Sequence, residues 1–204
     1  LPVTPVNRGG LDLSARRNGK FVFLKNGNSP DDLRRLWQER LPRSIARLVL
    51  DMADEVTPIG TKPGILHIGD FVAACLDARG IDPDSARLLV LFFSAQLDDY
   101  LRRVKSTMIV EAILDLPVFV QGSFWDHVDF TGRQARLLEP QSFDEVQQVF
   151  SEQLGVLDMS PNVDTGPHDR VMRAAGSYAT ALTNRTGWLD HNFPGFEELT
   201  FEFN

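Results

Sequence analysis

The spacing of apolar residues predicts a series of helices between about residues 30 and 105. In the first of them, apolar side chains recur every three or four positions, as on one helix face: Leu33, Leu36, Trp37 and Leu41. Ser29 and Pro30, directly before them, are typical of a helix cap and of a first helical position. Further helices are predicted over 44–56, 67–80 and 82–106, and the prolines and glycines of 57–64 interrupt the series.

From about Thr107 onward, short apolar runs alternate with helical segments. The predicted strands lie within 116–122, 135–140, 154–160, 179–184 and 199–203, and the predicted helices within 142–153 and 169–178. Apolar runs without a polar alternation are typical of a parallel sheet that is covered on both faces. The predicted fold class is therefore α/β, with a Rossmann-like parallel sheet preceded by a mainly helical region.

The chain is expected to divide into a mainly helical region, 1–105, and a Rossmann-like domain, 106–204. A short apolar strand, Phe21 to Leu24, lies between two turn-forming Asn-Gly pairs in the first region. We interpret this strand as an extended lead-in to the helices.

Charge and composition exclude several classes of function. The net charge of −7 argues against a nonspecific nucleic-acid surface, although it leaves room for a small basic pocket. The single cysteine, Cys75, excludes an internal disulfide and a multi-cysteine metal site. Because no run approaches the roughly 18 apolar residues of a membrane helix and no signal peptide is recognisable, we expect a soluble, cytoplasmic protein without a transmembrane segment.

A polar loop that leads into a predicted helix, "MSPNVDTGPHDRVMRAAG", is the first candidate site. Asp164 or Thr165 is expected to cap this helix, and the free N–H groups at its start favour an anion. Arg170 and Arg173 would add cationic donors suited to phosphate oxygens, and His168 would add a further donor. The alternative is an ordinary capped helix whose His and Arg side chains meet neighbouring acids.

A second candidate, "VFVQGSFWDH", follows the end of a predicted strand. Gly122 and Trp125 would line a ligand pocket there, and the alternative is a loop with one buried tryptophan. Asp126 and His127 are adjacent and have no evident third ligand, so no metal site is expected. Arg102, Arg103 and Lys105 come at the end of the last helix predicted before residue 107, where cations suit a helix C-terminus without any ligand.

Three sequence motifs of common enzyme classes are missing from the chain. It contains no G-x-S-x-G, no G-x-x-x-x-G-K-[ST] and no G-x-G-x-x-G. Their absence weakens interpretations as a hydrolase, a P-loop protein or a dehydrogenase.

The later half of the chain resembles the carboxyl-terminal domain of glycosyltransferases of the GT-B fold. Within these it is similar to the bacterial group with a glycosyl transferase family 1-type terminal domain, akin to the spore-maturation CgeB-like proteins. The resemblance rests on an ordered series of segments: LPVFVQGSFW, SFDEVQQVFSEQLGVLDMSPNVDTGPHDRVMRAAGSYATALTNRTGWL and FEELTFEF. It covers about residues 103–204 well, and FLKNGNSPDDLRRLWQERLP extends it loosely into the first half.

The resemblance implies that 106–204 is a nucleotide-sugar-binding domain. The donor would be held by Asn162, Gly166, His168 and Arg170 in the loop. Gly122 and Trp125 would lie near the same cleft, with Thr183 and Asn184 at the next strand end. Arg173 stands where many relatives carry a Glu that binds ribose, which leaves the donor nucleotide open. No cofactor and no metal are implied.

The expected function is transfer of a sugar from a nucleotide-sugar to an unknown acceptor. The departing diphosphate would be held by the helix N-terminus, His168 and Arg170. A complete GT-B enzyme has two Rossmann-like domains, so this chain is expected to be a fragment or a reduced relative, and no catalytic base is assigned. The alternatives are a noncatalytic interaction module, whose helical half docks a protein partner, and another phosphate-ligand enzyme such as a sugar-nucleotide epimerase.

Overall fold

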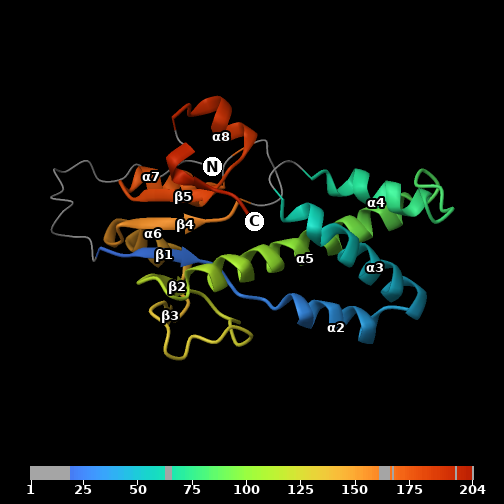
Figure 1. The fold of residues 1–204 in the computed structure, drawn as a ribbon, viewed down its shortest axis with the longest axis horizontal. Coiled ribbons are helices and arrows are strands. Elements are labelled where there is room, and N and C mark those ends of the chain that lie inside the picture. The colour runs from blue at the N-terminus through green and yellow to red at the C-terminus, as the bar shows by residue number, and fades with distance from the viewer. Residues whose placement is uncertain (1–18, 63–65, 161–165, 167, 196, 204) are drawn as a thin grey trace.

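The chain forms a six-stranded, entirely parallel β-sheet with helices packed on both faces (Figure 1). The computed structural model describes residues 19–62, 66–160, 166, 168–195 and 197–203. The strand order is β3-β2-β1-β4-β5-β6. The strands are β1 (Phe21–Leu24), β2 (Phe119–Gln121), β3 (Arg136–Leu138), β4 (Gly155–Asp158), β5 (Thr180–Asn184) and β6 (Thr200–Phe201). The predicted α/β, Rossmann-like fold is confirmed, and each predicted apolar run after residue 107 contains one strand.

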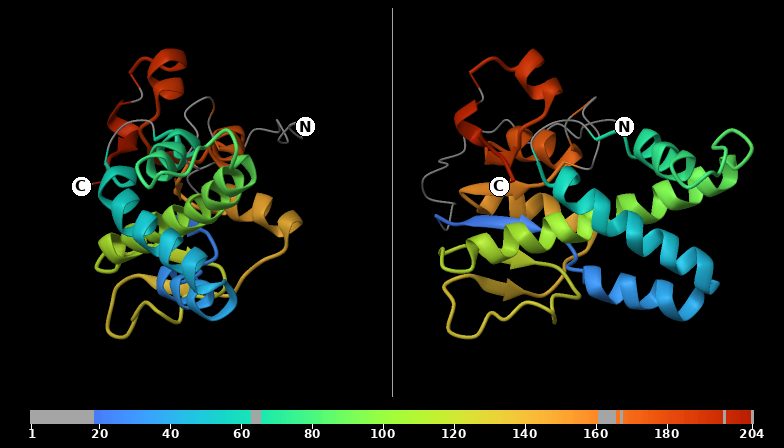
Figure 2. Two further views of the ribbon diagram at one scale, coloured as in Figure 1. Left: turned by 90° about the vertical axis from the view of Figure 1, so that its right-hand side faces the viewer. Right: turned by 45° about the vertical axis from the view of Figure 1, so that its right-hand side comes forward.

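Four helices lie between β1 and β2 along the chain, and they project to one side of the sheet (Figures 1 and 2). They are α2 (Pro30–Arg40), α3 (Arg43–Gly60), α4 (Ile68–Asp77) and α5 (Arg87–Ile113). The remaining helical elements are α6 (Phe143–Glu152), α7 (Asp169–Gly176), α8 (Gly187–Asn192) and the 3-10 turn η1 (Glu197–Leu199). The described helices contain no segment that is both long and apolar enough to cross a membrane.

Strand β1 lies in the middle of the sheet, between β2 and β4. The interpretation of 21–24 as a lead-in to the helices is therefore wrong, because this strand supplies the hydrogen-bonding partner for both neighbours. The helical region does not simply precede the sheet, since it is inserted after the first strand. Helix α5 runs through the expected boundary at residue 105, and the division into two domains stays a prediction.

Apolar side chains form separate cores in the helical region and on the two faces of the sheet. The helical core is built around Trp37, Met52 and Leu101, which are buried between α2, α3 and α5. The end of α5 covers one face of the sheet, where it packs with Phe23, and α6 and α7 cover the opposite face, where Val22 is buried. Successive side chains of β1 point to opposite faces of the sheet, so this strand contributes to both cores.

Two helices continue beyond their predicted C-terminal ends, and α5 begins at Arg87 instead of the predicted Asp82. Helix α3 continues through Pro58 to Gly60 instead of stopping at the link. Helix α5 continues to Ile113 because the apolar residues after 106 pack on the sheet. Arg102 and Arg103 therefore lie inside the helix, where they form i,i+4 ion pairs with Asp98 and Asp99 at 2.7 and 2.8 Å, and they do not act on its C-terminus.

Candidate functional site

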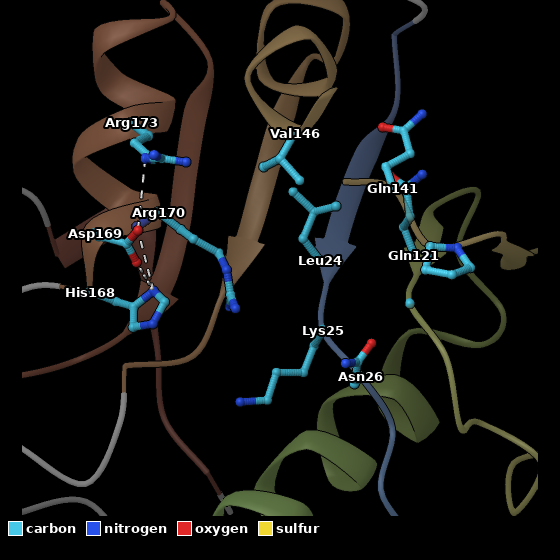
Figure 3. A pocket seen from close by; sticks show the side chains of 12 residues that line it. Leu24, Lys25, Asn26, Gln121, Gln141, Val146, His168, Asp169, Arg170 and Arg173 are labelled. Carbon is cyan, nitrogen blue, oxygen red and sulfur yellow. Dashed lines mark hydrogen bonds and ion pairs between the residues drawn. The ribbon is translucent and has the colours of Figure 1, made fainter. Parts of the chain in front are cut away.

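A pocket of about 460 Å³ opens at the carboxyl ends of the strands, next to the point where the strand order reverses. The chain leaves β1 for β2 on one side, while β4 pairs with β1 on the other. Open parallel sheets bind their ligands at such a point. The lining residues come from five segments (Figure 3): Leu24, Lys25, Asn26, Gln121, Gly122, Pro140, Gln141, Val146, His168, Asp169, Arg170 and Arg173.

Helix α7 presents its first turn to this pocket. His168 is the N-cap residue, and its Nδ1 accepts a hydrogen bond from the backbone N–H of Arg170 at 3.4 Å. The expectation that Asp164 or Thr165 caps the helix is wrong, because the helix begins at Asp169 and the imidazole supplies the acceptor. Asp164 and Thr165 themselves lie outside the described residues.

A buried carboxylate, Asp158, holds the charged side chains of α7 in place. Asp158 ends strand β4 and is completely buried. Its Oδ1 lies 3.2 Å from Nη1 of Arg170 and 3.4 Å from Nδ1 of His168, while its Oδ2 has no hydrogen-bond partner in the described part of the chain. The sequence interpretation missed Asp158 because it lies inside an apolar run, although an acid at the end of a buried strand is a usable signal.

Lys25 brings a further cation to the pocket from the end of β1. Burial lowers the pKa of its ammonium group, and the nearby charges of Arg170 and Arg102 lower that pKa further, against a weaker opposing effect of Asp158. Figure 3 shows its side chain extending toward the side on which Arg170 lies. Burial and the two arginines thus oppose the charge of this lysine more than Asp158 and Asp99 favour it. The sequence analysis missed Lys25, because the strand before it was not expected to belong to the sheet.

Tight backbone packing fixes the loops that carry Lys25 and Gly122. The N–H of Lys25 donates to the carbonyl of Gln121 at 3.0 Å, and the N–H of Gly27 donates to that of Ser123 at 2.8 Å. At Gly122, φ is +150° and a Cβ would lie 2.1 Å from the carbonyl oxygen of Lys25. Glycine at 122 therefore allows the two strand ends to approach.

Trp125 packs against the segment that carries Lys25 and is not one of the residues that line the pocket. Its side chain is buried, and its indole N–H donates to the carbonyl oxygen of Lys25 at 2.9 Å. The ring packs against Phe23 with the centroids 6.3 Å apart. A loop with one buried tryptophan, which the sequence left open as the alternative, describes Trp125. Asp126 and His127 in the same loop are exposed.

The remaining predicted site residues that the structure describes do not line the pocket. Thr183 is buried and pairs in register with Asp158 on the neighbouring strand. Asn184 accepts a hydrogen bond from the N–H of Ser160 at 2.7 Å, which is a contact within the protein. Gly166 is half-buried, and Asn162 lies outside the described residues. Of the nine predicted residues, Gly122, His168, Arg170 and Arg173 come together at the pocket.

Among the residues that the structure describes, no three His, Cys, Asp or Glu side chains gather as metal ligands would. Comparison of the chain with protein-family models, with curated proteins and with solved structures found no match.

Proposed function

We propose that the pocket binds the diphosphate of a nucleotide-sugar and that the chain is a glycosyltransferase or the donor-binding part of one. The observation that carries this proposal is the convergence of cationic side chains on one pocket at the reversal of strand order. Lys25 reaches the pocket from β1, and His168, Arg170 and Arg173 reach it from α7. The resemblance of residues 103–204 to the GT-B carboxyl-terminal domain names the donor class.

The balance of charge in the pocket favours an anionic ligand. Lys25, Arg170 and Arg173 face two carboxylates, Asp158 and Asp169. Asp158 is shared between Arg170 and His168, and Asp169 lies 3.1 Å from Nδ1 of His168 and 3.8 Å from Nε of Arg173. Among the described residues at the pocket one cation is thus in excess, and the start of α7 adds the positive end of a helix dipole. A diphosphate would relieve the repulsion between Lys25 and Arg170.

The same groups suit the chemistry of sugar transfer. When the bond between the anomeric carbon and the diphosphate breaks, negative charge accumulates on the departing phosphate oxygens. Cationic donors that the fold already holds in position stabilise this charge more than they stabilise the bound donor. Asp158 contributes by holding Arg170 at the pocket wall.

A thermal-shift screen with UDP, GDP, ADP and dTDP tests the proposal. A ligand that binds only the folded chain at about 100 times its Kd stabilises it by roughly 2.7 kcal/mol. For a chain of this size we expect at least one nucleotide to raise the Tm by about 5 °C or more. If no nucleotide raises the Tm, the result supports the noncatalytic interaction module.

Replacing Lys25 with methionine is expected to weaken nucleotide binding and to stabilise the ligand-free chain. The variant is expected to bind the responding nucleotide about tenfold more weakly, since one charge-assisted contact is lost. The ligand-free variant should be more stable at pH 7, because the pKa of Lys25 is lowered in the folded state, which makes its charge unfavourable there. Calorimetric titration and thermal melts measure the two effects.

The pH dependence follows from the same lowered pKa. As pH rises through the pKa of Lys25 in the folded chain, the ammonium loses its proton and nucleotide affinity should fall, at a lower pH than an ordinary lysine would give. The stability of the ligand-free wild type should rise in that range, because the unfolded chain there binds more protons. The Lys25→Met variant should lack both effects. Equal affinity of wild type and variant from pH 7 to pH 10 would argue against Lys25 as a ligand contact.

A further inference from the structure

The pocket has two chemically different walls, which Figure 3 shows on opposite sides of Lys25. The α7 side carries His168, Asp169, Arg170 and Arg173, which all bear or can bear a charge. The facing side is formed by uncharged residues from the ends of β2 and β3, among them Gln121, Gly122, Pro140 and Gln141. A ligand that fills the pocket therefore meets ionic groups at one end and amide groups at the other.

Gln121 is the best-defined group of the uncharged wall. Its side chain is 6% exposed, and its Nε2 donates to the carbonyl oxygen of Glu139 at 3.0 Å. Because a carbonyl oxygen can only accept, this contact fixes the amide with its nitrogen toward Glu139. The other amide atom, Oε1, has no hydrogen-bond partner among the described residues. Gln121, a residue of the pocket lining, thus carries an acceptor in a fixed orientation.

We infer that Gln121 determines ligand specificity, because Oε1 accepts a hydrogen bond from an N–H or O–H on the uncharged part of the ligand. This inference rests on the proposed function and names the chemistry that the second wall recognises. The pocket volume of about 460 Å³ fits a ligand larger than a diphosphate alone. A ligand that covers this acceptor without donating a hydrogen bond to it leaves it unsatisfied, which is unfavourable, so a ligand without the matching group is selected against. The N–H or O–H group that donates to Oε1 belongs either to the nucleoside or to the transferred sugar.

The test compares wild type with Gln121→Met, which keeps the length of the side chain and removes the acceptor. Calorimetric titrations use inorganic pyrophosphate, UDP, GDP, UDP-glucose and GDP-mannose. We expect about tenfold weaker binding of the larger ligands by Gln121→Met, which corresponds to about 1.4 kcal/mol. Pyrophosphate affinity should stay within about twofold, since the phosphate contacts lie on the α7 side. Gln134→Met, a change at an exposed glutamine outside the pocket lining, should leave all affinities unchanged.

The outcomes show which part of the ligand carries the N–H or O–H group that Gln121 accepts from. If Gln121→Met binds the nucleoside diphosphates more weakly, the group belongs to the nucleoside. If it binds only the nucleotide-sugars more weakly, the group belongs to the sugar. Unchanged affinity for every ligand overturns the inference, as does an equal loss for pyrophosphate. If the wild type binds pyrophosphate and none of the larger ligands, the specificity role of Gln121 is overturned while the anion site stands. If the wild type binds none of these compounds, the proposed function fails and the inference fails with it.

A second measurement keeps the test decisive if Gln121→Met does not fold. The side-chain amide resonance of Gln121 in the wild-type protein reports the environment of Oε1 directly. It is expected to shift when a nucleotide or nucleotide-sugar binds and to stay in place with pyrophosphate. The same resonance position with every bound ligand contradicts the role of Gln121.

Discussion

Replacing Arg170 with alanine is expected to abolish detectable nucleotide binding and to destabilise the chain by about 2–3 kcal/mol. Arg170 neutralises Asp158, which is completely buried, and its loss leaves that carboxylate, among the described residues, with His168 at 3.4 Å and the nearby charge of Lys25. Breaking a buried ion pair costs about 3–5 kcal/mol, and the partial exposure of the arginine reduces this value. Chemical denaturation and calorimetric titration of the same preparation measure both effects.

A double variant, Asp158→Asn with Arg170→Ala, separates the two losses. Without the buried charge, the double variant should recover most of the lost stability, because the remaining amide is neutral. Nucleotide binding should stay undetectable, since the guanidinium is still missing. A single Arg170→Ala variant that is as stable as the wild type and binds nucleotide with the same affinity would contradict the assigned role of this pair.

Replacing Gly122 with alanine is expected to cost more than about 3 kcal/mol, or to prevent folding. The added Cβ would lie 2.1 Å from the carbonyl oxygen of Lys25, and φ at this position is +150°. Relief requires the ends of β1 and β2 to separate, which disrupts their backbone hydrogen bonds. Urea denaturation of the purified variant measures the loss, or the amount of folded protein shows that it does not fold.

Gly69 provides the matched control. It lies in α4, has no positive φ, and nothing lies within 4 Å of a Cβ built there. Gly69→Ala is expected to leave stability unchanged or to raise it by up to about 1 kcal/mol, as is usual in a helix. Equal changes in the free energy of unfolding for Gly122→Ala and Gly69→Ala would show that the close approach of the backbone at Gly122 does not limit the side chain at this position.

Local patterns predicted most of the fold. The segment 154–160 has the unbroken apolar character of a covered parallel strand, and Ser29 with Pro30 starts α2 as expected: the Ser29 hydroxyl accepts from the N–H of Asp32. The place of β1 was not predictable in this way. Its partners, β2 and β4, lie about 95 and 135 residues further along the chain, and nothing near Phe21 records that pairing.

The predicted residues of the candidate site were Gly122 after β2 and three residues at the start of α7. Arg170 and Arg173 are three residues apart, a spacing that places both on one helix face, and His168 lies directly before the helix. Lys25 and Asp158 join them through the pairing of β1 with β4, which the sequence does not show. Trp125 was predicted to line the pocket for a related reason. Its indole contacts the segment after β1, which the sequence did not place next to the end of β2.

The central claim is that a diphosphate binds between Lys25 and the start of α7. A crystal structure of the chain with the nucleotide that raises its Tm most tests it directly. We expect the phosphate oxygens within hydrogen-bonding distance of Lys25 Nζ and the Arg170 guanidinium, with the nucleoside toward Gln121 or toward the open side of the pocket. A nucleotide bound elsewhere, with this pocket occupied only by solvent at saturating ligand, would contradict the account.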